Sequence, residues 1–308
     1  MAERTLQNLN LIDNFLFFTL VDHEQYGRVV VRTILETVLQ REVRIGKITS
    51  EKVLMSRTPG KHGIRMDAFI QEDAENISGG DVFDLEPENK ASEKEVLPKR
   101  ARYYQSRMDN KTLQSGEGYG ALREAWVIFI TSFDPFGERR MVYTVKRRCV
   151  EVPALKYEDG AVTRFLYVDG KPGDAPKELQ ELLHYMARTT PENACNAKLR
   201  EIQEYVDELK QSPEVKESYM SFQDYLMAER REAIQEVEAA LVQAEEERDA
   251  QTERATAAEA ERDAQTERAK LAEAQRDALS MEVEKLRNEL ARLQKQGGNR
   301  GRYSVSHE

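Results

Sequence analysis

The chain has 308 residues, 40% of them hydrophobic and 33% charged, and this length suggests about two structural units. Its formal net charge of −10 excludes a general attraction to nucleic acid, so polyanion binding would need a local basic patch or metal ions. No apolar stretch approaches the roughly 20 residues of a membrane span, and the N-terminus lacks the basic-then-apolar order of a signal peptide. The two cysteines show no paired spacing, so we expect a soluble, reduced protein of the cytoplasm with no membrane association.

The first predicted elements are a helical region and two strands. Residues 10–40 have apolar positions near helical spacing, with Asp13 as a plausible N-cap. Residues 43–57 are typical of a strand that runs into the polar turn TPGKHG. GIRMDAFI, residues 63–70, alternates between an apolar face and a second face that carries Asp67, as a half-buried strand does.

Three carboxylates stand at alternate positions in VFDLEPENK, residues 82–90, although strands are normally depleted in acids. The alternation predicts that Phe83 and Leu85 face the core and that Asp84 and Glu86 face away from it. Together with residues 63–70 the segment is expected to form a hairpin with a long loop.

The remaining elements of the first unit complete a mixed sheet. They are a helix over 97–110 that starts at Pro98, a buried strand over 125–131, a strand within 139–152, a hairpin turn at Asp159-Gly160, an amphipathic helix over 177–188 and a helical segment over 197–226. This order predicts an α/β fold with helices on the faces of the sheet.

The C-terminal part is predicted to be one long coiled-coil helix. Residues 228–295 contain 18 acidic and 12 basic residues and no aromatic residue, and a 14-residue repeat, RDAQTERATAAEAE, starts at 248 and recurs with changes at 262. A seven-residue period puts apolar residues at a and d near both ends, and arginine and glutamine at these positions in the middle. The expected organisation is a domain over 1–195, a connecting segment over 196–227, a coiled coil over 228–296 and a disordered tail over 297–308.

Asp67 and Glu86 are the strongest candidates for a metal site. If their strands are adjacent, the two carboxylates converge, and hard oxygen ligands suit Mg²⁺ or Mn²⁺. A metal held there can bind a phosphodiester oxygen and lower the pKa of an attacking water.

GIRMDAFI, VFDLEPENK, LPKRARYYQ, AWVIFIT and FDPFG resemble, in this order, the PD-(D/E)XK nuclease superfamily, and within it the bacterial recombination-promoting nuclease or nuclease-family transposase group. The likeness covers about residues 8–190. It implies a restriction-endonuclease-like α/β core and Mg²⁺-dependent cleavage of DNA, with a role in recombination or mobile elements.

The resemblance assigns Asp67 and Glu86 to the two metal-binding acids of the family. The third motif position, which carries Lys or Gln in the family, is Glu88 here, and this is a departure. Glu88 could bind metal or accept a proton from water. In an alternative register Lys90 is the catalytic lysine, brought into place by a bulge at Pro87. A solvated strand face and a site without activity are further alternatives.

Basic and aromatic residues near the proposed site are candidates for contact with the DNA backbone. They are Arg65 and, on the helix over 97–110, Arg100, Tyr104 and Gln105. The structural alternatives are an ion pair for Arg65, packing under the sheet for the tyrosine and solvent exposure for the arginines. Glu36 is either an additional acid of the site or plain helix surface.

We therefore expect a metal-dependent endodeoxyribonuclease that binds DNA and forms a homo-oligomer through its coiled coil. The competing interpretations are a catalytically degenerate nuclease fold that binds DNA and a coiled-coil scaffold.

Overall fold

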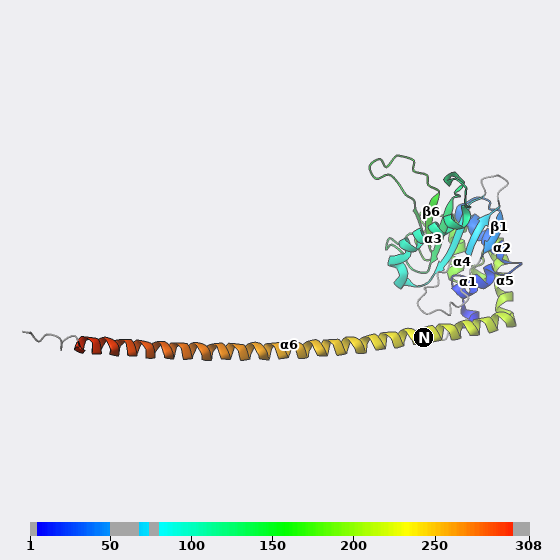
Figure 1. The fold of residues 1–308 in the computed structure, drawn as a ribbon. Coiled ribbons are helices and arrows are strands. Elements are labelled where there is room, and N and C mark those ends of the chain that lie inside the picture. The colour runs from blue at the N-terminus through cyan, green and yellow to red at the C-terminus, as the bar shows by residue number, and fades with distance from the viewer. Residues whose placement is uncertain (1–4, 50–67, 74–79, 298–308) are drawn as a thin grey trace, which may run out of the picture. The chain divides into compact units, whose positions relative to one another are not determined.

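The computed structural model describes residues 5–49, 68–73 and 80–297, and the chain divides into two compact units, Met1–Tyr225 and Leu226–Glu308. The first unit contains a six-stranded sheet in the order β1-β2-β3-β4-β6-β5 (Figure 1). The strands are β1 (Ile45–Thr49), β2 (Ala68–Glu72), β3 (Val82–Glu88), β4 (Ala125–Thr131), β5 (Val142–Val145) and β6 (Ala161–Tyr167). The helices are α1 (Asn14–Val21), α2 (Gly27–Leu39), α3 (Leu97–Thr112), α4 (Lys177–Ala187), α5 (Ala197–Gln211) and α6 (Pro213–Gly297). Short 3₁₀ turns are η1 (Leu6–Asn8), η2 (Ala91–Val96), η3 (Tyr119–Ala121) and η4 (Pro191–Asn193).

The sheet is mixed, which confirms the predicted α/β class. β1, β2 and β3 are antiparallel neighbours, β3, β4 and β6 are parallel neighbours, and β5 pairs antiparallel with β6 at the edge. The crossover from β3 to the parallel β4 contains α3, since parallel neighbours cannot be joined by a tight turn. As a result β3 is a central strand, and both of its faces are covered.

The sheet separates two apolar clusters, because successive side chains of a strand point to opposite faces. On one face Phe83 and Leu85 pack in the larger cluster, together with residues of α1, α2, α4 and α5. On the other face Val127 and Phe129 pack in a smaller cluster that includes Leu97, Ala101, Tyr104 and Met108 of α3. The second face is therefore the one that α3 covers.

The predicted helical region over 10–40 consists of two helices rather than one. α1 ends at Val21, and α2 begins at Gly27. The two helices approach so closely there that a Cβ atom on Gly27 would lie 2.0 Å from the carbonyl oxygen of Val21. Only glycine permits this approach, which explains why the chain turns at this point.

The predicted tight hairpin at Asp159-Gly160 is wrong. β5 ends at Val145 and β6 begins at Ala161, so a long connection joins the two antiparallel strands. Gly160 does have a positive φ of 72°, and the Asp159 carboxylate accepts a hydrogen bond from Ala161 N at 3.2 Å. The pair therefore makes a local turn into β6, but it does not connect two strands directly.

α5 belongs to the folded core of the first unit, although the sequence pattern suggested a connecting segment. Leu199, Ile202 and Val206 are buried in the larger cluster. Lys198 Nζ also lies 3.0 Å from Glu36 Oε2 on α2. Glu36 thus pairs with a neighbouring helix.

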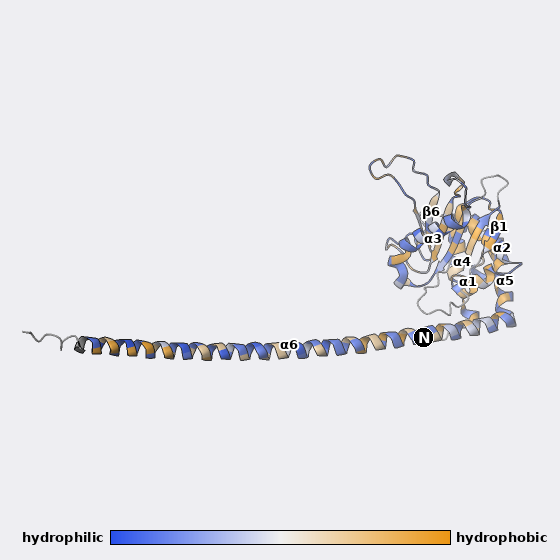
Figure 2. Cartoon of the chain, viewed as in Figure 1, coloured by the Kyte–Doolittle hydropathy of each residue, from blue (hydrophilic) through white to orange (hydrophobic). Residues whose placement is uncertain are grey.

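α6 is a continuous helix of 85 residues. Its first turns pack within the first unit, where the ring of Tyr219 lies 4.9 Å from that of Phe15. Residues 226–294 are all exposed. Figure 2 shows hydrophilic residues along the middle of α6 and recurring apolar residues toward its C-terminal end, as the heptad pattern predicts.

Three further expectations concern the cysteines, membrane association and the tail. Cys149 and Cys195 are free thiols. Within the described part of the chain, no helix is apolar over a length that could cross a bilayer. The expected disordered tail falls almost wholly on residues 298–308, which lie outside the described residues.

Candidate functional site: a buried acidic row on β3

Asp84, Glu86 and Glu88 lie on the face of β3 that α3 covers. The predicted alternation of the strand is confirmed, because Phe83 and Leu85 point into the opposite cluster. The alternative of a solvated strand face is wrong, since Asp84 is 0% exposed and Glu86 only 2%. The reason is that β3 is central and its second face is covered by a helix.

The strand register shows what surrounds the acids. Asp84 is paired with Phe69 of β2 on one side and with Val127 of β4 on the other. Glu86 is paired with Phe129, and Glu88 with Thr131. These neighbours are mostly apolar, so the charge of the row must be balanced by groups from α3 or by a ligand.

Arg100 of α3 supplies the balancing charge. Its Nη2 donates to Glu86 Oε1 and its Nη1 donates to Glu88 Oε2, so that one guanidinium joins both carboxylates. The guanidinium carbon also lies 5.6 Å from the ring centre of Phe129 and 5.7 Å from that of Tyr104. The planar fork of arginine suits this arrangement, because two of its nitrogens can bond two acceptors at once.

α3 presents Arg100 to the sheet because its apolar residues recur at three- and four-residue spacing. The residues of α3 that are buried are Leu97, Ala101, Tyr104, Gln105 and Met108. Arg100 is one turn before Tyr104 and therefore shares its side of the helix. The adjacent Tyr103, by contrast, is 44% exposed.

Tyr104 and Gln105, both predicted to contact DNA, are buried against the sheet. Tyr104 Oη lies 3.3 Å from Glu86 Oε1, and Gln105 Nε2 donates to Thr163 Oγ1 at 3.2 Å. This agrees with the packing alternative for Tyr104. Contact of Arg100, Tyr104 or Gln105 with DNA stays a prediction.

The electrostatics of the site keep Arg100 charged and Tyr104 neutral. Burial would lower the pKa of Arg100, but the charge of Glu86 and the hydrogen bond to Glu88 outweigh it, and the pKa is raised. Burial and the nearby charge of Glu86 raise the pKa of Tyr104. The phenol therefore remains a hydrogen-bond donor at neutral pH.

Lys90 does not have the position that the alternative register requires of a catalytic lysine. Its side chain is exposed, and its backbone N–H donates to Glu88 Oε1 at 2.8 Å. The register of β3 with β4 continues through Pro87, which is paired with Ile130, so the bulge that the alternative register needs is absent on this side of the strand. The described structure thus offers no backbone irregularity that would turn Lys90 toward Glu86.

Asp67 and Arg65 lie outside the described residues. The residue that follows Asp67 in the sequence, Ala68, is paired with Leu85, the residue before Glu86. The predicted adjacency of the two strands is therefore confirmed for their described parts, because β2 and β3 are antiparallel neighbours.

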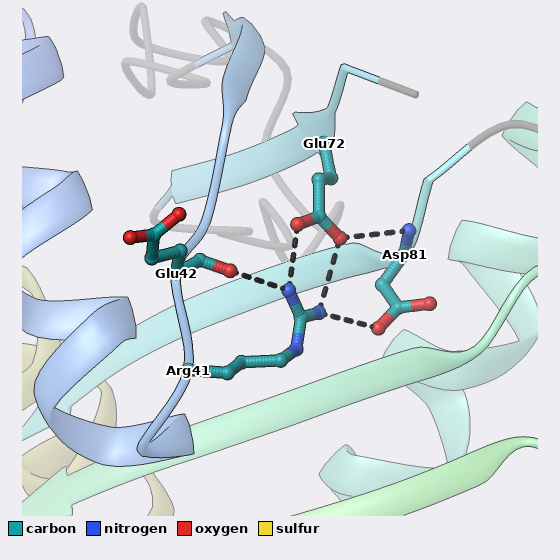
Figure 3. A network of polar contacts seen from close by, with 4 residues as sticks. All are labelled: Arg41, Glu42, Glu72 and Asp81. Atoms are coloured by element: carbon teal, nitrogen blue, oxygen red, sulfur yellow. Dashed lines mark hydrogen bonds and ion pairs between the residues drawn. The ribbon is translucent and has the colours of Figure 1, made fainter. Parts of the chain in front are cut away.

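A polar network holds the far end of this strand pair (Figure 3). Arg41 Nη1 lies 2.7 Å from Glu72 Oε1, and Arg41 Nη2 lies 2.7 Å from Asp81 Oδ2. The backbone N–H of Asp81 also donates to Glu72 Oε2 at 3.3 Å. Glu72 ends β2 and Asp81 precedes β3, so the network connects the two chain ends that must align for the register of the site.

The donor chemistry of the row fits a hard divalent cation. Glu86 and Glu88 offer carboxylate oxygens, which Mg²⁺ prefers, but one oxygen of each already accepts from Arg100. Among the described residues no group of three or more His, Cys, Asp or Glu is arranged to hold a metal ion. Of the two predicted metal ligands, the described residues contain Glu86, and Asp67 lies outside them.

Sequence reasoning missed the ion pair between α3 and β3. The available signal was that β3 is followed by a crossover to a buried strand, which makes it central and covers its acids. A covered acid needs a cation, and Arg100 is the arginine at the start of the crossover helix. Comparisons with known proteins add no relative, since no family model, curated protein or solved structure matches this chain.

Proposed function

We propose that the chain is a Mg²⁺-dependent DNA endonuclease of the recombination-promoting, transposase-associated PD-(D/E)XK type, in which Asp67 and Glu86 hold the metal. The observation that carries the proposal is the buried row of carboxylates on β3 beside the strand that follows Asp67. Burying several acids on a central strand is costly unless they bind a cation, so the row has the character of a functional site.

When bound, Mg²⁺ would activate a water and bind an oxygen of the scissile phosphodiester. The residues of the chain have separate parts in this proposal. Asp67 and Glu86 would hold the metal, and Glu88 would accept a proton from the attacking water. Arg100, beside both glutamates, supplies the positive charge that Glu88 lacks at the position where the family carries Lys or Gln. Mn²⁺ has the same ligand preferences and could replace Mg²⁺.

The direct test is conversion of supercoiled plasmid to nicked or linear DNA, with Mg²⁺, Mn²⁺ or EDTA. We expect cleavage by the wild type with metal, and loss of at least a hundredfold in Asp67→Asn and Glu86→Gln. Glu36→Gln is the matched control, because Glu36 is paired with Lys198 between two helices. No cleavage by the wild type at any protein or metal concentration would overturn the proposal.

One observation favours a second candidate, a catalytically degenerate nuclease fold that binds DNA or acts as a coiled-coil scaffold. Arg100 already pairs with both Glu86 and Glu88, so these two acids have a cation within the chain itself. This candidate predicts no cleavage, and DNA binding that is unchanged in Asp67→Ala. Deletion of residues 228–308 distinguishes the two forms of this candidate. A scaffold function that depends on α6 should be lost, whereas DNA binding by the first unit should remain.

Under either candidate we propose that the chain forms a homo-oligomer through α6. The exposed residues 226–294 carry the heptad pattern that buries its seam only in a partner helix. For a nuclease, a dimer would join two sites in one assembly, which suits cleavage of both strands of a duplex.

A further inference from the structure

Arg164 of β6 is a half-buried arginine without a carboxylate partner among the described residues. Its Nη1 donates to the carbonyl oxygen of Val38 at 2.5 Å, and its guanidinium carbon lies 5.2 Å from the ring centre of Trp126. Its Nε is buried and has no hydrogen-bond partner in the described part of the chain. Burial lowers the pKa of Arg164. Leaving a buried cation with one carbonyl and one aromatic face is unfavourable, unlike the arrangement of Arg100.

A pocket of about 360 Å³ adjoins this arginine. It lies between the end of α2, the edge formed by β5 and β6, and the segment that leads into α4. Arg140 and Lys171 also line it, against a single acidic residue, Asp174. The side chains of Arg140 and Lys171 are exposed. Within the described part of the chain, no hydrogen bond or ion pair is seen for either of them. The pocket is therefore positively charged.

The apolar part of the pocket and the nearby helix end narrow the kind of ligand. Met141, Val142 and Leu179 form apolar wall, so a ligand with an organic body gains contact there. Pro176, the N-cap of the 11-residue α4, also lines the pocket. The N-terminus of a helix favours a negative charge, and it adds to the effect of the three cations.

We propose that this pocket binds a small organic anion, with its phosphate or carboxylate group on Arg164 and its apolar body against Met141 and Leu179. A simple capping role, in which Arg164 satisfies the last carbonyls of α2, accounts for Nη1 alone. It leaves the buried Nε and the two additional cations of the pocket without a role. The pocket lies on the face of the sheet opposite the acidic row. Arg164 is paired with Ile128, so it shares the face of the larger cluster, whereas the acids share the face of Phe129.

The test uses phenyl phosphate, benzoate and inorganic phosphate with the full-length protein, by isothermal titration calorimetry and thermal shift. We expect saturable binding of phenyl phosphate or benzoate that weakens at high salt. Binding should weaken at least tenfold in Arg164→Met, and also in the double variant Lys171→Met and Arg140→Met, which changes only exposed side chains. Lys177→Met is the matched control, because Lys177 is exposed on α4 and does not line this pocket. The difference between phenyl phosphate and benzoate identifies the anionic group. Equal binding by wild type and both variants, or no saturable binding of any probe, would overturn the proposal.

A second inference rests on the charges that flank the seam of α6 and does not depend on the nuclease proposal. The a and d residues at both ends of the helix are exposed apolar side chains, among them Ile234, Leu241, Leu286 and Leu290 at 48%, 59%, 60% and 58%. The single-chain helix leaves this seam uncovered. Its occupant must match both the apolar seam and the flanking charges.

The flanking positions e and g favour a second copy of the same chain in parallel, in-register alignment. In that alignment each g residue meets the e residue of the following heptad on the other copy. The charged pairs formed are Arg254 with Glu259, Arg268 with Glu273, and Glu282 with Arg287, and each joins opposite charges. An antiparallel alignment brings e positions against each other, and these are more often glutamate than arginine, for example at Glu245 and Glu259.

We infer that α6 forms a parallel, in-register, two-stranded coiled coil with a second copy. Arginine at the a positions 248, 262 and 276 reduces the apolar seam in the middle, and its long stem lets the charge reach solvent beside the seam. Polar residues at a restrict oligomer state and register at some cost in stability.

Cysteine crosslinking tests the alignment directly. In a full-length Cys149→Ser and Cys195→Ser background, Leu241→Cys and Leu286→Cys should each give a disulfide-linked dimer in high yield, because in-register copies place equal positions together. A variant with Arg254→Glu and Arg268→Glu should dimerise at least tenfold more weakly, and mixing it with Glu259→Arg and Glu273→Arg should restore a heterodimer. Two results would overturn the inference. One is that the wild type is a monomer in sedimentation velocity at 50 times the protein concentration of the crosslinking experiment, and the other is that neither cysteine variant crosslinks.

Discussion

Arg100 on α3 and Glu86 on β3 form a hydrogen-bonded ion pair on the covered face of the sheet, and the same guanidinium reaches Glu88. The pair connects the crossover helix to the central strand, so it has both a structural and an electrostatic consequence. Structurally, it fixes the start of α3 over β3. Electrostatically, it places one positive charge beside two buried carboxylates.

The first prediction concerns the stability that this ion pair provides. Arg100→Met should lower the free energy of unfolding by about 3–5 kcal/mol, since it leaves two buried carboxylates without their cation. Urea denaturation at pH 7 measures the change. The triple variant Arg100→Met, Glu86→Gln and Glu88→Gln should recover most of it, because the buried charges are then removed as well. A loss that the triple variant does not recover would show that Arg100 stabilises the fold through packing alone.

The second prediction concerns competition between Arg100 and a divalent cation. If Glu86 binds Mg²⁺, removal of Arg100 frees carboxylate oxygens for the metal, and Mg²⁺ should raise the melting temperature of Arg100→Met by more than it raises that of the wild type. Differential scanning calorimetry with MgCl₂ or EDTA measures the shift, and CaCl₂ shows whether the effect is specific to Mg²⁺. The combination Arg100→Met and Glu86→Gln is the control and should show no Mg²⁺ effect. Identical curves with Mg²⁺ and EDTA for all variants would favour the degenerate fold.

The parts of the fold that the sequence predicts are those with a local signal. AWVIFIT is an uninterrupted apolar run with the length of a strand, and it is the buried β4. LPKRARYYQ carries Pro98 in its first turn, as helix starts often do, and it begins α3. The antiparallel pairing of β2 with β3 also followed from two alternating segments, since Phe69 is paired with Asp84.

The parts that sequence reasoning could not predict depend on contacts between distant segments. Asp84 alternates with apolar residues in the same way whether its face meets water or a helix, so the alternation alone does not report its burial. The cation of the site, Arg100, comes from the following element, and only the packing of α3 brings it to Glu86. The break at Gly27 depends on its approach to Val21, a tertiary contact that periodicity does not report.

The third prediction tests whether Glu88 or Lys90 is the third functional residue of the proposed site, beside Asp67 and Glu86. Lys90→Met should leave metal-dependent plasmid cleavage within twofold of the wild type, because its side chain is exposed and β3 has no bulge at Pro87. Glu88→Gln should reduce cleavage at least tenfold, since the amide cannot accept a proton from water. Lys94→Met, a lysine-to-methionine change at a partly exposed position on η2, controls for loss of surface charge. A large loss of cleavage in Lys90→Met alone would restore the alternative register.

The fourth prediction follows from the network that aligns β2 and β3. Arg41→Met should lower the free energy of unfolding by about 1 kcal/mol, because the network is partly exposed and its pairs are screened by solvent. Urea denaturation at low and high salt measures it, and the effect should shrink at high salt. Arg139→Met is the matched control, since its side chain is exposed and takes part in no ion pair described in the structure. An effect that does not depend on salt would point to lost packing of Arg41 against Phe83, whose ring centre is 5.9 Å away.

The fifth prediction concerns the pH dependence of stability through Asp81. Burial and the charge of Glu124 raise the pKa of Asp81, although Arg41 opposes them. The folded state therefore holds this proton more tightly than the unfolded state, whose pKa is about 3.9. As pH rises from about 3.9 through the folded pKa, Asp81 should contribute a progressive loss of stability, which is complete above the folded pKa. The difference in free energy of unfolding between wild type and Asp81→Asn should fall over this window in urea titrations at pH 3.5–7.

Glu214 provides a control of opposite sign for the same experiment. The hydrogen bond from Ser212 lowers the pKa of Glu214, so its folded pKa lies below the unfolded one. Its contribution is present above the unfolded pKa and is lost as pH falls through the folded pKa. The difference between wild type and Glu214→Gln should therefore rise with pH in the acid range, while that for Asp81→Asn falls. Two differences of the same sign would show that the Arg41 network, rather than burial, dominates the titration of Asp81.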